Sequence, residues 1–423
     1  MKFFRQNKGF SAKSINFFSY KKYKNTFILG GFILIVCIGA FLLLTQYLGL
    51  FFEDKKDEHS LDAYAERIVE VCKDASYRPV CYEKEVPKLV VELESPQIFN
   101  VIRLIRKYDP EYLFCHVVAH DLGAYEVSLN PDNWLDVIAK GPTDGLCSNG
   151  FAHGAIVTRF NDGKLSPEAF EFALRDLKIA CEEREGWNPT ELIKAICYHG
   201  IGHVFVHMTE ADIPISLDGC ERVALKDDDR DYRQVCYEGV YMQLFQPLEP
   251  EDYALIDQLP LAPTRDNIVQ FCEENSSNEL EYGTCWREAW PFFYGELFDR
   301  EGVLNYCLAL TEESDQEKCF ITAFTINGRH HLGQPEKMSS FCNSLPSAYQ
   351  GMCLARGANA FPEEDQTLIP EAIDMCSRGA SKEIQDECYL YLAQVASFNF
   401  HEGSEPFEEL CSSLPAEWER QCR

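Results

Sequence analysis

The residues most suited to chemistry lie between positions 116 and 207, which hold six of the ten histidines in the chain. They are His116, His120, His153, His199, His203 and His207. His116 and His120 are four residues apart, as are His199 and His203, so each pair falls on one face of a helix. Neutral imidazole is a ligand for zinc, copper, iron and nickel. The spacing therefore indicates a metal site or a proton-exchanging centre on a helix.

These histidines follow cysteines at similar distances. The segments that start at Cys115, Cys147 and Cys197 are CHVVAHDLGAY, CSNGFAHGAIV and CYHGIGHVFVH, and the one that starts at Cys236 is CYEGVYMQLF. Equivalent positions of neighbouring helices converge when the helix axes pack about 8–10 Å apart. We therefore expect one transition-metal site of three or four histidines, with His153 as the middle ligand and zinc, copper or iron as the ion.

Carboxylates in the same windows are the candidate catalytic residues. Asp121, Glu126 and Glu238 would act as a general base or as further ligands of a metal ion that activates water. These ligand types do not separate hydrolysis from redox chemistry. The sequence contains no Gly-x-Ser-x-Gly elbow, phosphate-binding loop or His-Glu-x-x-His motif, so whether the protein is an enzyme stays open.

Glycines accompany the histidines. In helices they cost about 1 kcal/mol each relative to alanine. We expect them either to let helices approach closely or to leave room for a small ligand. The six are Gly123, Gly150, Gly154, Gly200, Gly202 and Gly239.

The competing hypothesis is a non-enzymatic scaffold with structural histidines. A histidine pair four residues apart is more often structural than metal-binding, and His207 lies two turns beyond the start of its predicted helix. Such a scaffold would present a concave acidic groove to a protein, a peptide or a cationic ligand.

Cysteines set the architecture that would position these residues. Cys285, Cys319, Cys353, Cys388 and Cys422 follow one another at intervals of 34, 34, 35 and 34 residues, which is typical of helical-hairpin arrays. A first cysteine ends a short amphipathic run and a second one, 9 to 16 residues later, begins a longer apolar run. We expect an all-α solenoid of hairpins, each stapled by a local disulfide that contributes roughly 3 kcal/mol.

Two cysteines do not fit the local pattern. Cys115 and Cys147 each begin an apolar run without a nearby first partner. Parity favours a ninth disulfide between them, and the alternative is a pair of free thiolates that join His116 and His153 as metal ligands.

The period and the paired cysteines resemble the tetratricopeptide and Sel1-like superfamily, closest in style to its disulfide-rich secreted members. The resemblance covers roughly residues 180–423 and includes a small residue early in each second helix, namely Ala323, Ala355 and Ala393. Spacing within units is wider than in those proteins, and their Leu-Gly and Tyr-x-x-Gly signatures are mostly missing. It implies a similar fold and protein or peptide binding.

The N-terminal part predicts a membrane anchor. Residues 26–52 contain no charged side chain, whereas residues 1–25 carry seven lysines and arginines, which places the N-terminus in the cytoplasm and the bulk outside it. All 68 acidic residues lie at or after Glu53, and such a body would repel nucleic acid. Of the nineteen cysteines, Cys37 lies inside the predicted anchor, which leaves an even number after it. An even set of cysteines suits an oxidising compartment, at the cell surface or in a periplasm.

The predicted organisation has five parts. These are a basic cytoplasmic segment (1–25), a transmembrane signal anchor (26–52), a linker and N-terminal helical cap (53–110), histidine-rich helical repeats that hold the site (111–215), and a cysteine-paired helical array (216–423).

Overall fold

The computed structural model describes residues 61–109, 112, 115–142, 146–160, 163–224, 231–247 and 250–423. The chain divides into two units, residues 1–64 and 65–423, and the helices below belong to the second. No helix within the described ranges is both long and apolar enough to span a bilayer. The predicted cytoplasmic segment and anchor lie outside these ranges.

The described part of the chain is helical and contains no strand, which confirms the predicted all-α class. The helices that carry or follow the second cysteine of a pair, together with α4, which follows Cys115, are here called B helices. They are α4 (His116–Leu129), α6 (Gly150–Phe160), α8 (Glu191–Thr209), α10 (Tyr232–Phe245), α13 (Glu279–Glu288), α16 (Glu313–His330), α18 (Ser347–Glu364) and α20 (Lys382–Asn399).

The helices that end within three residues of the first cysteine of a pair are here called A helices. They are α7 (Pro167–Ala180), α9 (Ile213–Val223), α12 (Ile268–Glu274), α15 (Arg300–Leu308), α17 (Pro335–Ser344), α19 (Ile369–Ser377) and α21 (Glu405–Ser413). The remaining elements are α2 (Arg78–Glu85), η1 (Pro87–Val91), α3 (Ser95–Tyr108), η2 (Pro131–Asn133), α5 (Trp134–Ile138), η3 (Leu146–Asn149), α11 (Pro250–Ile256), η4 (Trp290–Phe293), α14 (Tyr294–Leu297), η5 (Gln366–Leu368) and α22 (Ala416–Cys422).

Disulfides join neighbouring cysteines throughout the described ranges, with Cα–Cα distances of 4.7 to 5.7 Å. The local pairs are those predicted from the sequence. Cys115 and Cys147 form the ninth bridge, so the alternative in which they serve as thiolate metal ligands is wrong. The nine pairs are Cys72–Cys81, Cys115–Cys147, Cys181–Cys197, Cys220–Cys236, Cys272–Cys285, Cys307–Cys319, Cys342–Cys353, Cys376–Cys388 and Cys411–Cys422.

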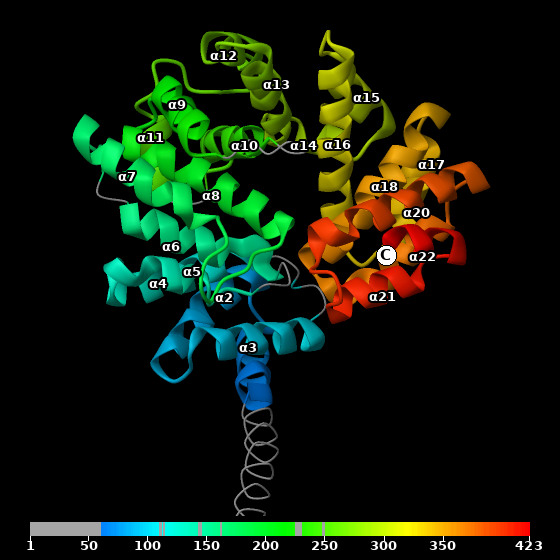
Figure 1. Cartoon of the computed structure of the whole chain (residues 1–423), viewed down its shortest axis with the longest axis horizontal. Coiled ribbons are helices and arrows are strands. Elements are labelled where there is room, and N and C mark those ends of the chain that lie inside the picture. The colour runs from blue at the N-terminus through cyan, green and yellow to red at the C-terminus, as the bar shows by residue number, and fades with distance from the viewer. Residues whose placement is uncertain are drawn as a thin grey trace, which may run out of the picture. The chain divides into compact units, whose positions relative to one another are not determined.

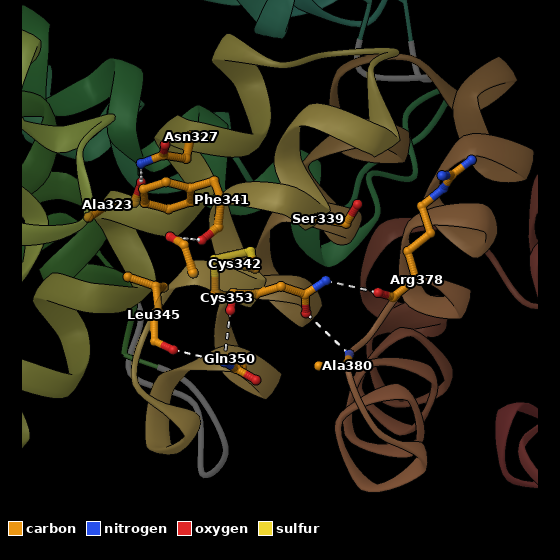
Figure 2. The surroundings of a disulfide bond; sticks show 12 residues. Ala323, Asn327, Ser339, Phe341, Cys342, Leu345, Gln350, Cys353, Arg378 and Ala380 are labelled. Atoms are coloured by element: carbon orange, nitrogen blue, oxygen red, sulfur yellow. Dashed lines mark hydrogen bonds between the residues drawn. A yellow bond between two sulfur atoms is a disulfide. The ribbon is translucent and has the colours of Figure 1, made fainter.

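A glutamine three residues before the second cysteine reinforces three consecutive hairpins. Figure 2 shows the hairpin closed by Cys342–Cys353, where the Gln350 side chain donates to the backbone carbonyl of Leu345 at 2.8 Å. Gln316 donates to Leu310 and Gln385 to Gly379 in the same way. Each turn is therefore held by a disulfide and by a hydrogen bond from the following helix.

Consecutive B helices touch along the row from α4 to α20 (Figure 1). Glycines bring the backbones of these helices together. A Cβ atom added at Gly154 in α6 would lie 1.9 Å from the carbonyl oxygen of His120 in α4. One added at Gly239 in α10 would lie 1.9 Å from the carbonyl oxygen of His199 in α8. The expectation of close helix approach is confirmed at these positions.

The last B helices also contact elements near the beginning of the row. Helix α20 packs against α8, and His401 Nε2, just after α20, donates to the carbonyl of Asn188, just before α8, at 2.9 Å. Arg106 in α3 is 3.2 Å from Asp365, which follows α18. Repeats of an open solenoid contact only their neighbours, so these contacts are an addition to the predicted architecture.

The long interval between Cys236 and Cys285 holds an inserted helix, α11. After Cys285 the B helix is interrupted, because α13 ends at Glu288 and Pro291 lies in the short 3₁₀ helix η4. The inserted helix supplies one residue of the site described below.

The glycine contacts predict a position-specific loss of stability. Gly154→Ala should lower the free energy of unfolding by about 1–3 kcal/mol, because its Cβ meets backbone that cannot move aside. Gly295→Ala is the matched control, since nothing lies within 4 Å of a Cβ there. Guanidinium unfolding at equilibrium measures both, and equal losses in the two variants would contradict the packing account.

Candidate metal centre

Three B helices carry the histidines. Helix α8 begins at a threonine N-cap, where the Thr190 side chain accepts from the Ile193 backbone N–H at 3.3 Å. It continues without a break to Thr209, so His199, His203 and His207 lie on one face. His116 begins α4 and His153 lies in the first turn of α6.

Four imidazole rings meet between these helices. The ring centroids of His116 and His153 are 5.1 Å apart, and those of His153 and His203 are 5.3 Å apart. His199 lies 4.9 Å from His203 and 6.0 Å from His153. The structure therefore brings together His116, His153, His199 and His203, with His153 in the middle as the alignment predicted.

A glycine makes room for the central ring. His153 is buried, with 5% of its surface exposed. A Cβ atom at Gly200 in α8 would lie 2.4 Å from Cδ2 of His153. The segment Tyr198–His199–Gly200 thus provides one imidazole and the space for another.

Three rings have hydrogen-bond partners on their nitrogens, and His199 has a second partner in the backbone of Val235. His153 Nε2 lies 3.3 Å from the Ile196 carbonyl oxygen, and His203 Nδ1 lies 2.6 Å from Oε1 of Gln243. His199 Nε2 lies 3.1 Å from the Met242 sulfur. Hydrogen bonds of this kind fix the tautomer and the orientation of a ring. In the described ranges, no three His, Cys, Asp or Glu side chains already stand at the positions of a complete metal-ligand set.

His207 and His120 lie at the edge of this group and face a carboxylate that the sequence analysis missed. His207 Nε2 is 3.5 Å from Oδ1 of Asp252, and that carboxylate also accepts from Gln243 Nε2 at 2.6 Å. Asp252 raises the pKa of His120, against the larger lowering effect of burial. Asp252 lies in α11, and the unusually long Cys236–Cys285 interval was the signal that could have directed attention to it.

Burial keeps the histidines neutral. It lowers the pKa of His199 to about 4, with Arg329 and His116 adding to the effect. Burial and the neighbouring His199 lower the pKa of His203 to about 3, and burial holds the pKa of His153 well below its ordinary value. Neutral imidazole is the protonation state that binds metal ions.

The three predicted catalytic carboxylates have other partners. Glu126 accepts from Ser95 Oγ at 2.8 Å and from Lys140 Nζ at 2.9 Å. Glu238 accepts from Gln234 and from Arg287, at 3.1 and 3.3 Å. Asp121 lies close enough to His120 to oppose the lowering of its pKa by burial. Asp252, in contrast, lies 3.5 Å from the ring of His207.

Next to the histidines, the row of B helices becomes charged. Glu238 and Arg287 occupy the second position after their cysteines, as His199 does, and they pair with each other. Glu288 is 7% exposed. Burial, and then the nearby Glu238, raise the pKa of Glu288 to about 8, against the lowering effects of Arg287 and Arg329. A protonated carboxyl group therefore lies beyond the imidazoles.

Comparisons with protein-family models, with curated proteins and with solved structures found no match to this chain.

The carboxyl group of Glu288 predicts a pH dependence of stability. In the native state Glu288 stays protonated up to about pH 8, whereas in the unfolded chain it loses its proton near pH 4.5. The free energy of unfolding therefore falls as pH rises from about 4.5 to about 8. The loss is at most about 1.4 kcal/mol for each pH unit.

Glu288→Gln should remove this loss, because the amide has no proton to release. Glu317→Gln, at an exposed position of α16, is the control and should keep the wild-type slope. Guanidinium unfolding at pH 5, 6.5 and 8 measures the difference, and a Glu288→Gln variant with the wild-type slope would contradict the assignment.

Proposed function

We propose that this protein is a membrane-anchored, extracytoplasmic helical-repeat protein that captures a transition-metal ion with its clustered histidines. The observation that carries the proposal is the meeting of four imidazole rings from α4, α6 and α8, at centroid distances of 4.9 to 6.0 Å. His153, His199 and His203 are neutral at physiological pH, so no proton has to leave their ring nitrogens before an ion binds.

The hydrogen bonds of two rings support a role as ligands. A metal-binding histidine usually donates its second ring nitrogen to a carbonyl or another acceptor, which orients the first nitrogen toward the ion. His153 uses Nε2 for the Ile196 carbonyl, and His203 uses Nδ1 for Gln243. This leaves Nδ1 of His153 and Nε2 of His203 for an ion. His116 and His199 lie beside these two rings and are the further candidate ligands.

Copper is the ion that this site suits best. The Met242 sulfur lies 3.1 Å from Nε2 of His199, so a thioether joins the imidazoles. Soft sulfur ligands favour cuprous copper, whereas zinc and iron sites rely on imidazole, thiolate and carboxylate. The Asp252–His207 pair is the group that would accept or release a proton if the bound ion also acts on a substrate.

The rest of the chain supports the location and the repeat architecture. Nine disulfides are the cross-links of an oxidising compartment. Residues 26–52 have the length and composition of a transmembrane anchor. The recurring glutamine hydrogen bonds and A–B hairpins support a solenoid of about 34-residue units, similar in organisation to Sel1-like proteins.

Elemental analysis of the full chain, purified in detergent after growth with copper, zinc and iron, tests the function. We expect about one copper ion per chain, and its loss in a His153→Gln, His203→Gln double variant that removes two central ligands. The control is His330→Gln, His331→Gln, which alters two neighbouring imidazoles outside the site, of which His330 stacks on Phe298. A metal-free wild-type chain, or a double variant that keeps its ion, would contradict metal capture and favour the scaffold hypothesis.

The thioether gives a separate prediction on the identity of the ion. Met242→Leu conserves volume, so the fold should be retained at a cost below about 1.5 kcal/mol. We expect cuprous affinity to fall at least about tenfold, with zinc affinity unchanged, because only copper gains from the sulfur. Competition titrations with a chromophoric chelator measure both ions, and equal changes for copper and zinc would exclude a sulfur ligand.

A further inference from the structure

A pocket of about 470 Å³ lies where the C-terminal end of the B-helix row meets α3 and the start of α8. Its walls come from α3, from the segment after α5, from the start of α8 and from the residues between α20 and α21. Phe99 and Phe400 give it apolar surface. The pocket shares no lining residue with the imidazole cluster, so it is separate from the candidate metal centre.

The charge of this pocket is opposite to that of the chain. The formal net charge of the protein is −29. None of the described residues that line the pocket is acidic, whereas Arg103, Lys140 and His401 are basic or titratable. The Lys140 ammonium donates to Glu126 and carries three donors in all, so this bond does not exhaust it. The local chemistry therefore favours an anion over the cation that the overall charge would attract.

A buried acceptor in the wall needs a donor. Asn399 is 2% exposed, and its Nδ2 donates to Oδ1 of Asn359 at 2.8 Å. Asn359 Nδ2 donates in turn to the carboxylate of Glu363 at 2.6 Å. The Glu363 carboxylate can only accept, so Asn359 must turn its Nδ2 toward Glu363 and its Oδ1 toward Asn399. Asn399 must then donate to that Oδ1 through its own Nδ2.

This order leaves Oδ1 of Asn399 buried and without a hydrogen-bond donor, and the buried Ser404 Oγ is also unpartnered. An unpartnered buried polar atom costs about 1–3 kcal/mol. Both residues line the pocket. A ligand with an N–H or O–H group would donate the hydrogen bond that these oxygen atoms lack.

We propose that this pocket binds a small organic carboxylate that carries an apolar body and a hydrogen-bond donor. The carboxylate lies against Arg103 and Lys140, the apolar body against Phe99 and Phe400, and the donor points to Asn399. The volume falls in the range of about 300–1,000 Å³ that small-molecule sites occupy. Because α3 and the α20–α21 connection both contribute walls, the bound ligand contacts both of these segments, which lie far apart in the sequence.

Matched probe molecules test the ligand class on the full chain in detergent. The probes are the N-acetyl derivatives of alanine, leucine and phenylalanine, each as the free carboxylate and as the neutral amide. Phenylalaninamide is the cationic probe. Ligand-observed NMR and calorimetry report binding. We expect at least one carboxylate to bind with a Kd of about 1 mM or tighter, and its amide and the cationic probe to bind at least about tenfold more weakly.

Variants locate the binding. Arg103→Gln with Lys140→Gln should weaken the carboxylate at least about tenfold and leave the amide unchanged, since only the charge contact is lost. Arg265→Gln with Lys164→Gln removes two cations outside the pocket and is the control. The His153→Gln, His203→Gln variant should bind the probe as the wild type does, which separates this site from the metal centre.

Three results would overturn the proposal. They are the absence of a carboxylate that binds better than its amide, preferential binding of the cationic probe, and undiminished carboxylate binding in the Arg103→Gln, Lys140→Gln variant. Circular dichroism and thermal unfolding confirm that this variant is folded before binding is measured.

Discussion

The close contact between consecutive B helices is the constraint on which the site depends. Gly154 in α6 lies against the His120 carbonyl of α4, and Gly200 in α8 makes room for the His153 ring of α6. Gly239 in α10 lies against the His199 carbonyl of α8. At these separations, side chains of α4, α6 and α8 reach one shared volume. The histidines occupy that volume, so the packing of the helices and the meeting of the rings are the same structural fact. Disulfides close the hairpins, and in three of them a glutamine side chain also donates to a carbonyl in the turn. These local links hold the two helices of a hairpin together while the B helices pack against one another.

Burial then determines the chemistry of the shared volume. Because water solvates the imidazoles poorly, the charged forms of His199 and His203 are disfavoured and the rings stay neutral. Further along the row the same effect keeps Glu288 protonated. The B helices thus carry a neutral imidazole region and, next to it, a region of paired arginines and glutamates. Arg329, which lowers the pKa of both His199 and Glu288, lies within electrostatic range of the two regions.

Local features of the fold could be predicted from the sequence, whereas contacts between distant segments could not. The cysteine period predicted the hairpins and the disulfide pairs, because two cysteines separated by a short stretch of chain stay close together when that stretch forms a hairpin. The alignment on cysteines placed His153 between His116 and His199 because neighbouring repeats pack in register. Asp252 and Met242 were missed, since the position of the inserted helix α11 and the direction of a flexible methionine depend on tertiary packing. The pocket between α3 and α20 arises from contact between segments far apart in the sequence, which a repeat period does not encode.

The central claim is that imidazoles from three successive helices bind one ion. X-ray absorption spectroscopy of the copper-loaded full chain tests it most directly, because the spectrum reports the ligands of the ion itself. The account predicts imidazole scattering from at least two rings together with one sulfur neighbour, and the loss of the imidazole signal in the His153→Gln, His203→Gln variant. A spectrum of oxygen ligands without imidazole, or one identical in wild type and variant, would contradict it.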